Sequence, residues 1–327
     1  MKLLSLRTLV LLFAVLVPAL SRADEPEQSF DTWLAAFKAE ALGKGISQAT
    51  LDSAFTDVRT IDRVVELDRK QPEFTLTFQW YMGSVVSDRR IVDGKAALKR
   101  QRALLKAVSA KYGVPPAQIV ALWGIESNFG RSTGTFPVVA ALATLAYDGR
   151  RSQYFRGELM RALEMVQGGV PAERMRGSWA GAMGQCQFMP STFRKYAVHW
   201  GEGTATAAPD IWGSEADVFA SAANYLASIG WKKDERWGRE VKLPARGIGD
   251  SLLGLDKTHS VTEWNKLGVR QANGKPLPSS NVRASLVRAA DGPAYLVYDN
   301  FKVIMQWNRS TLFGVAAGTL ADRIASR

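Results

Sequence analysis

One carboxylate, Glu126, stands in a sequence setting that favours acid–base chemistry. It lies near the end of the segment GVPPAQIVALWGIESNFG, residues 113–130. Ile119, Leu122 and Trp123 precede it by seven, four and three residues, so a helix would place all four side chains on one face. Because apolar neighbours disfavour a charged carboxylate, we expect the pKa of Glu126 to be raised toward the range that a general acid needs.

A second interpretation of Glu126 stays open on this pattern alone. The residues that follow, Ser127, Asn128 and Gly130, are typical of a polar turn, where the Glu126 side chain could rotate toward solvent. A lone glutamate on an apolar stripe does not identify a catalytic acid, since its burial cannot be observed in a sequence.

The helix that positions Glu126 is expected to begin at Pro115 and Pro116 and to run to about Glu126, because the first helical turn tolerates missing N–H groups. A second unusual segment, MRGSWAGAMGQCQFMP at residues 175–190, interleaves glycines with Ser178, Gln187 and Phe188. Such a loop lets the backbone approach a ligand closely, although glycines also serve plain tight packing.

The remaining segments predict a mainly α protein with a small β portion. Amphipathic patterns predict helices from Phe30, over 95–111, and over 217–230 with Tyr225 inside. An aromatic-rich segment at 71–85 contains Tyr81. Short runs after Trp237 predict a few strands, and the chain closes with two helical pieces broken near Asn308 and Arg309, as turn residues indicate.

The first 23 residues have the pattern of a cleavable secretory signal, with a basic start, a short apolar run and a small-residue end. Removing its three basic residues, Lys2, Arg7 and Arg22, leaves 39 basic against 31 acidic residues, a net charge of +8. This charge favours anionic partners. Export argues against nucleic acid and leaves an acidic envelope polymer or lipid surface, or a basic surface with no specific partner.

Neither a disulfide nor a metal is expected. Cys186 is the only cysteine, so no intrachain disulfide can form, and no cysteine follows the signal for lipid attachment. We expect Cys186 to pack rather than react, because only His199 and His259 are present as partners. The acidic loop 199–217 holds His and Gly where a calcium loop needs early oxygen ligands, so no cofactor is predicted.

Four motifs in order, WGIESNFGRSTG, GSWAGAMGQCQFMPSTF, DVFASAANYLASIGW and FKVIMQWNRS, make this sequence similar to the B-type lytic murein transglycosylases. The resemblance runs from about Phe30 to the C-terminus. It implies a lysozyme-like catalytic core embedded in a larger helical protein, over residues 111–235. The region 24–110 would then be N-terminal and helical, and 236–327 would combine a small strand-containing region with C-terminal helices packing on the core.

The resemblance also implies the activity and the site residues. The family cleaves the β-1,4 bond between N-acetylmuramic acid (MurNAc) and N-acetylglucosamine (GlcNAc), and its sole catalytic acid lies in the ES pair that matches Glu126. Its substrate-cleft residues match Tyr81, Ser178, Gln187, Phe188, Tyr225 and Asn308. The implied partner is the peptidoglycan glycan strand, with cell-wall synthesis or remodelling proteins as further candidates.

Three departures from the family limit what the resemblance implies. The carboxylates of the calcium loop that some members carry are missing, so calcium is not implied. Trp307 stands where some relatives have Tyr, which keeps an aromatic wall but removes a hydroxyl. The acylated cysteine of lipoprotein members is absent, so a periplasmic protein without a stable membrane anchor is expected.

The resemblance implies only one carboxylate, whereas ordinary glycoside hydrolysis uses two. We therefore expect an intramolecular reaction that forms a 1,6-anhydromuramoyl product. A hydrolytic muramidase and a noncatalytic peptidoglycan-binding protein stay open as alternatives.

Overall fold

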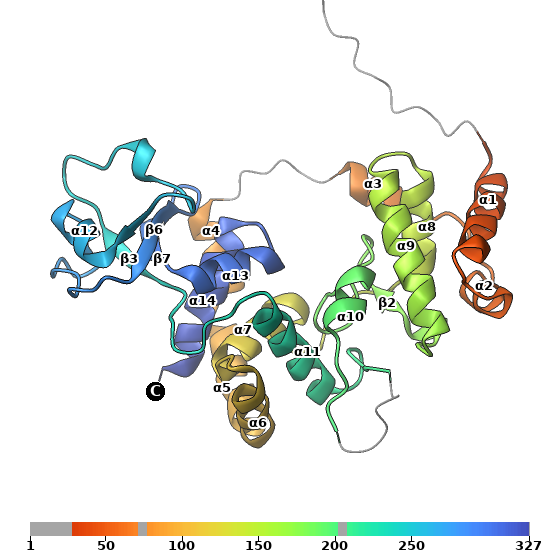
Figure 1. Ribbon diagram of the computed structural model, residues 1–327, viewed down its shortest axis with the longest axis horizontal. Coiled ribbons are helices and arrows are strands. Elements are labelled where there is room, and N and C mark those ends of the chain that lie inside the picture. The colour runs from red at the N-terminus through yellow and green to blue at the C-terminus, as the bar shows by residue number, and fades with distance from the viewer. Residues whose placement is uncertain (1–27, 71–76, 202–207, 327) are drawn as a thin grey trace, which may run out of the picture.

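The computed structural model describes residues 28–70, 77–201 and 208–326, and it confirms a mainly α protein with a small β portion (Figure 1). The α-helices are α1 (Phe30–Gly43), α2 (Gln48–Ala54), α3 (Asp62–Arg69), α4 (Phe78–Val85), α5 (Asp88–Arg100), α6 (Arg102–Tyr112), α7 (Pro116–Ser127), α8 (Val138–Tyr147), α9 (Ser152–Gln167), α10 (Pro190–Tyr196), α11 (Glu215–Ser228), α12 (Val261–Lys266), α13 (Asp299–Trp307) and α14 (Thr311–Ala325). Two 3₁₀ turns are η1 (Ala172–Arg174) and η2 (Asp250–Leu252).

The strands are short, as the runs after Trp237 predict for that part of the chain. They are β1 (Phe136–Pro137), β2 (Arg176–Gly177), β3 (Gly238–Lys242), β4 (Thr258–Ser260), β5 (Arg270–Gln271), β6 (Arg283–Arg288) and β7 (Ala294–Val297). β1 and β2 form a small antiparallel pair, and the other five strands form an antiparallel sheet in the order β4-β6-β7-β3-β5.

Helix α7 lies at the centre of a helical cluster and is packed by α5, α6, α11 and α14. Its residues 117–124 are all buried, which explains why the segment is apolar around most of its circumference. At one end of the molecule α1, α2 and α3 pack against α8 and α9 (Figure 1). The apolar core continues through both groups of helices.

The single helix predicted over 95–111 is wrong in one respect, because the chain turns at Gln101 and divides it into α5 and α6. The side-chain amide of Gln101 donates a hydrogen bond to the Glu215 carboxylate at the start of α11. The division lets α5 pack on α7 and α14 while α6 packs on α11. Helix propensity alone continues through this point, so only the tertiary contacts reveal the turn.

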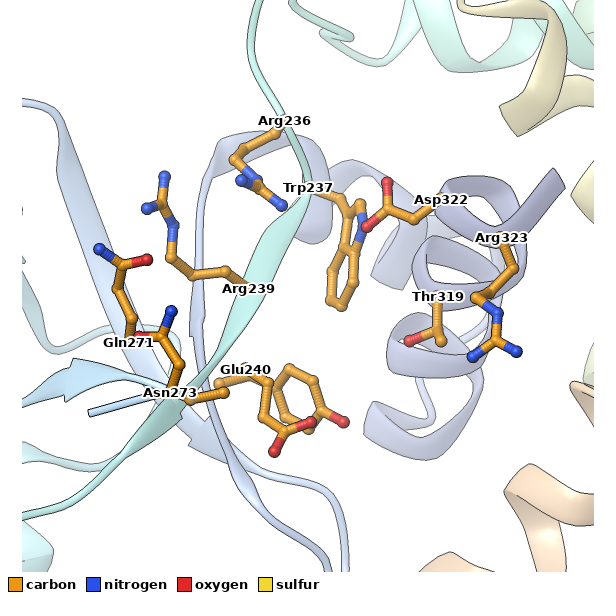
Figure 2. Close-up of a pocket in the computed structure, with 11 residues that line it drawn as sticks. Arg236, Trp237, Arg239, Glu240, Gln271, Asn273, Thr319, Asp322 and Arg323 are labelled. Atoms are coloured by element: carbon orange, nitrogen blue, oxygen red, sulfur yellow. The ribbon is translucent and has the colours of Figure 1, made fainter. Parts of the chain in front are cut away.

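The five-stranded sheet has its own apolar cluster, which includes Trp264. It joins the helical core through Val287 of β6, Tyr295 and Val297 of β7, and Trp237 just before β3. Trp237, just before β3, donates a hydrogen bond from Nε1 to Oδ2 of Asp322 on α14, at 3.0 Å (Figure 2). Gly318 on the same helix leaves room for that indole, since a Cβ there would meet ring atoms at 2.2 Å. The sheet is therefore fixed against α14. Within the described ranges, no helix combines the length and the apolar character needed to cross a membrane.

Candidate active site

Helix α7 delivers Glu126 at its last turn, as its sequence predicts. Pro116 occupies the first turn, and the helix ends where Asn128, Phe129 and Gly130 adopt positive φ angles of 50°, 58° and 79°. The buried hydroxyl of Ser127 donates to the Trp123 carbonyl and accepts from the Gly130 amide, both at 3.1 Å. These bonds hold the left-handed turn against the helix end and so fix where Glu126 lies.

Among the described residues, the carboxyl group of Glu126 faces mainly apolar side chains and accepts one hydrogen bond. Trp307 at the end of α13 donates from Nε1 to Oε1 of Glu126 at 2.8 Å. A cavity of about 10 Å³ beside the carboxyl, room for at most one water, is lined by Ile119, Leu122, Trp123, Gln185, Cys186, Val218, Phe219 and Ala222. The predicted face of Ile119, Leu122, Trp123 and Glu126 is therefore present.

The surroundings raise the pKa of Glu126 to about 7 from its ordinary value of 4.5. The main cause is burial: although part of the side chain is accessible to solvent, protein atoms surround the carboxyl densely and disfavour its charge. The hydrogen bond from Trp307 acts in the opposite direction, because it stabilises the ionised form. Near neutral pH the group is poised between donating and accepting a proton.

Aromatic rings form a wall beside this carboxyl. Phe188 and Tyr225 lie with their ring centroids 5.4 and 5.1 Å from that of Trp307, and 5.7 Å from each other. Tyr196 stacks on Tyr225 at 4.5 Å, and the Tyr225 hydroxyl donates to the Gln306 carbonyl at 3.0 Å. Two residues predicted from the sequence, Phe188 and Tyr225, are thus brought to Glu126 through Trp307.

Tyr81 on α4 also reaches this site. Burial raises its pKa above the usual range, and the negative charge of Glu126 raises it further, which places the phenol within electrostatic reach of that carboxylate. The Arg90 guanidinium acts against this rise. Arg90 also donates to the carbonyls of Ser84 and Val85, at 2.9 and 2.6 Å, and so fixes the end of α4.

Ser178 and Gln187 brace the glycine loop rather than contact Glu126. The Ser178 hydroxyl accepts from the Ala182 amide at 3.0 Å. Gln187 has a φ of 49°, and its amide donates to the carbonyls of Thr133 and Gly184 at 3.0 and 2.8 Å. The bond to Thr133 ties the loop to the segment that follows Glu126.

Asn308 lies next to Trp307 and is exposed, and its side chain accepts from the Ser310 amide at 3.0 Å in the turn between α13 and α14. Its hydrogen bonds within the described chain are local. The structure therefore brings Tyr81, Phe188 and Tyr225 around the carboxyl and places Ser178, Gln187 and Asn308 at its margins.

Comparison with known proteins identifies the family. Residues 29–322 match the family model described as the transglycosylase SLT domain. The membrane-bound lytic murein transglycosylase B of Escherichia coli (strain K12) is 31% identical over 297 residues, which cover 86% of this chain and 79% of that protein. This chain belongs to the B-type lytic transglycosylase family.

Solved structures of SltB3 from Pseudomonas aeruginosa are similar to this transglycosylase over most of its length. The complex with NAG-NAM-pentapeptide is 44% identical, has a TM-score of 0.87, and shares 92% of this chain and 80% of that chain. The complex with NAG-anhNAM-pentapeptide is also 44% identical, with a TM-score of 0.85 over 90% and 79% of the two chains. These likenesses confirm the lysozyme-like fold expected from the sequence.

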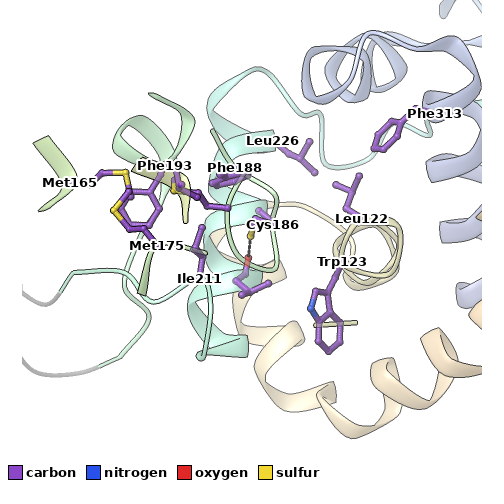
Figure 3. Close-up of a cluster of buried hydrophobic side chains, with 14 of the residues drawn as sticks. Leu122, Trp123, Met165, Met175, Cys186, Phe188, Phe193, Ile211, Leu226 and Phe313 are labelled. Atoms are coloured by element: carbon purple, nitrogen blue, oxygen red, sulfur yellow. Dashed lines mark hydrogen bonds between the residues drawn. The ribbon is translucent and has the colours of Figure 1, made fainter. Parts of the chain in front are cut away.

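The single cysteine of the transglycosylase is a core residue. Cys186 is buried, and Figure 3 shows it among apolar side chains, with Sγ donating to the Val218 carbonyl at 3.5 Å. Burial raises the pKa of this thiol above its usual range, so the reactive thiolate is disfavoured.

In the loop 199–217, Asp210 and Asp217 accept hydrogen bonds from backbone amides of the loop, while Glu215 accepts one from the Gln101 side chain. Asp217 accepts from the amides of Trp200 and Asp210 at 2.9 and 2.7 Å and lies 3.2 Å from His199 Nδ1. Asp210 accepts from two further amides, those of Trp212 and Gly213. Over residues 199–201 and 208–217 these side chains do not fit a calcium ion, and the described residues contain no group of three or more such ligands suited to a metal.

Sequence reasoning missed the contact between Trp307 and Glu126. The tryptophan is a visible departure from the tyrosine of relatives, but the two residues stand 181 positions apart. The spacing of residues within one helix cannot indicate a contact between two distant helices. From the sequence, the expected consequence of Trp307 is the loss of a hydroxyl. In the structure, its indole N–H donates a hydrogen bond to the Glu126 carboxyl.

Proposed function

We propose that this lytic murein transglycosylase cleaves the MurNAc-β-1,4-GlcNAc bond with Glu126 as its only acid and base. The observation that carries the proposal is a single carboxyl group, with a pKa raised to about 7, beside an aromatic wall. Glu126 is the one carboxylate among the residues that line its cavity. The ligands of the SltB3 structures, NAG-NAM-pentapeptide and NAG-anhNAM-pentapeptide, support peptidoglycan strands as the substrate.

In the first step, protonated Glu126 donates its proton to the glycosidic oxygen as the bond from C1 of MurNAc breaks. The carbonyl oxygen of the N-acetyl group on the same sugar stabilises the positive charge that develops at C1. Ionised Glu126 is then held by the indole N–H of Trp307. A hydrogen bond of this kind stabilises the carboxylate between the two proton transfers.

In the second step, Glu126 removes the proton from the C6 hydroxyl of that MurNAc, and the oxygen attacks C1 to close a 1,6-anhydro ring. The proton returns to Glu126, so no water is consumed and the acid is regenerated. The hydroxyl is already attached to the reacting sugar, which favours attack by proximity.

The other predicted residues take supporting roles in this proposal. Tyr225 would pack on a sugar ring, and Phe188, which is buried, would support the rings of Tyr225 and Trp307 from behind. Tyr81 would hydrogen-bond the substrate close to Glu126, and Asn308 would contact it from the exposed turn after Trp307. Ser178 and Gln187 would orient the N-acetyl group through the loop that their hydrogen bonds support.

Digestion of purified sacculi tests the proposal. The wild-type protein should release soluble muropeptides whose anhydro ends weigh one water less than reducing ends, and Glu126→Gln should release none while still binding sacculi. Reducing ends would instead identify a hydrolytic muramidase. Binding without release by the wild-type protein would identify a noncatalytic wall-binding protein.

We also place this protein in the periplasm, exported by a cleavable signal at residues 1–23, which lie outside the described residues. Support comes from the sequence pattern of that segment and from the murein substrate. The N-terminus of the mature protein, read by mass spectrometry of a periplasmic extract, should follow Ala23.

A further inference from the structure

A second pocket, of about 420 Å³, lies between the sheet and α14. Its lining shares no residue with the cavity at Glu126. Figure 2 shows Arg236, Arg239 and Asn273 on one side of the Trp237 ring and Arg323 of α14 on the other. The pocket is therefore an elongated space with basic side chains at both ends.

The floor between these ends is aromatic. The side chains of Trp237 and Tyr295 are buried, and their ring centroids lie 6.0 Å apart. Flat apolar rings of this kind pack well against the aliphatic part of a ligand.

Several hydrogen-bond donors at the sheet end have no acceptor within the described protein. Arg239 Nε is buried without a partner, and its guanidinium lies over the Tyr298 ring at 5.8 Å. Arg236 donates from Nε to the Gly238 carbonyl at 2.8 Å, which leaves its terminal nitrogens available. Asn273 accepts from Lys275 through Oδ1, and its amide nitrogen has no acceptor within the described protein.

Neither Arg236 nor Arg239 forms an ion pair in the described part of the chain. The two arginines line the same pocket, and Asp322 lies within electrostatic reach of Arg236 without forming an ion pair with it. A bound oxyanion would supply the paired acceptor that the two guanidinium groups lack. A carboxylate matches the planar fork of an arginine with two parallel hydrogen bonds. The sheet end is thus suited to a carboxylate.

The pocket also contains hydrogen-bond acceptors, which suit a ligand that carries hydrogen-bond donors as well as a negative charge. Glu240 and Asp322 line it, and neither is ion-paired with the arginines of the pocket. Asp322 accepts from Trp237 Nε1 at 3.0 Å and keeps its other oxygen for a second donor. Carboxylates placed beyond an aromatic floor suit the amide N–H groups of a peptide.

We infer that this pocket binds a short peptide with a free carboxylate, the kind of stem that murein strands carry. The inference rests on murein being the substrate, and the ligands of the SltB3 structures carry such a pentapeptide. The carboxylate would lie between Arg236, Arg239 and Asn273, and the peptide would extend across Trp237 toward α14.

Calorimetric titration of the full chain with a free pentapeptide stem tests this inference. The peptide with a free C-terminal carboxylate should bind, and the same peptide as a C-terminal amide should bind about tenfold more weakly or worse, since a charge-assisted pair is lost. Arg239→Gln and the exposed Arg236→Gln should each weaken binding of the free acid about tenfold. Thermal unfolding of both variants shows that the loss is not one of folding.

Two control variants distinguish peptide binding at this pocket from events at the active site. Arg288→Gln changes an exposed arginine of the same sheet outside the pocket and should leave the affinity unchanged. Glu126→Gln should also bind the peptide normally, even though it releases no product from sacculi. The inference would be overturned if the peptide did not bind, or if the acid and the amide bound equally well. It would also be overturned if Arg288→Gln lost as much affinity as the pocket variants, or if inorganic phosphate displaced the peptide at a similar concentration.

Discussion

At the scale of single residues, the environment of Glu126 gives the carboxyl an unusual effect on stability. Its folded pKa of about 7 lies above the ordinary 4.5 that applies to the unfolded chain. Such a group contributes stability that is complete below pH 4.5 and is lost as the pH rises through 7. Ionisation of Glu126 therefore costs the folded protein up to about 3 kcal/mol above neutral pH.

Glu126→Gln removes that cost and should make the protein more stable than the wild type at pH 8. The gain should reach up to about 3 kcal/mol and should vanish near pH 4, where the wild-type carboxyl is protonated in both states. Urea unfolding at the two pH values measures the difference. A variant of unchanged or lower stability at pH 8 would show that the carboxyl is not desolvated in the way that its pKa implies.

Trp307→Phe tests the hydrogen bond that Glu126 accepts from the indole N–H. Because the indole N–H stabilises the ionised carboxylate, its loss should raise the pKa of Glu126 further. The pH–rate profile of the wild type should fall above about pH 7 as the acid form is lost. In the variant this falling limb should move to higher pH with a lower maximum rate. Tyr112→Phe, at an aromatic side chain outside the active site, should leave the limb in place.

At the scale of elements, the turn after α7 depends on one buried hydroxyl. Ser127 both donates to the Trp123 carbonyl and accepts from the Gly130 amide. Ser127→Ala leaves that amide without its acceptor and should cost about 1–3 kcal/mol of unfolding free energy. Ser132→Ala, three positions beyond Phe129, is exposed and should change stability by less than about 0.5 kcal/mol. Similar losses in both variants would contradict this role of Ser127.

The elements differ in how well their sequences predict them. Helix α7 is predicted almost to its ends, because Pro115 and Pro116 mark its start and the polar turn marks its end. The turn at Gln101 is missed, since favourable helix formers continue through it and the cause is a contact with α11. The break before Thr311 is predicted from turn residues alone. Helix ends and breaks that depend on local residues are thus predicted correctly, whereas the turn at Gln101, which depends on tertiary packing, is not.

The candidate site shows the same difference between local and tertiary contacts. Burial of Glu126 among Ile119, Leu122 and Trp123 follows from a three-and-four spacing within one helix. The donor from Trp307 comes from a different helix far along the chain, and only the fold brings it near. The catalytic assignment of Glu126 and the boundaries 24–110, 111–235 and 236–327 stay predictions that the resemblance implies.

At the scale of the whole molecule, the proposed activity depends on the position of α13, because α13 carries Trp307 to the Glu126 carboxyl. The fully buried side chain of Asn300 helps to hold the start of α13. Its amide donates to the carbonyls of Lys232 and Glu235 at 2.8 and 2.6 Å, and its oxygen accepts from the Lys232 amide at 2.7 Å. One side chain thus fixes α13 to the segment that leads from α11 to the sheet.

Asn300→Ala removes the side-chain partner of three backbone groups, the Lys232 N–H and the carbonyls of Lys232 and Glu235, and should lower the free energy of unfolding by about 2–4 kcal/mol. Asn224→Ala loses one hydrogen bond to the Tyr196 carbonyl and a long one from the exposed Ser228 hydroxyl, and it should cost only about 1 kcal/mol. Urea unfolding of the two variants gives the comparison. At a temperature where Asn300→Ala is still folded, its release of muropeptides should also fall, because Trp307 is no longer held at Glu126. Full activity in the folded variant would show that the position of α13 is fixed by its other contacts.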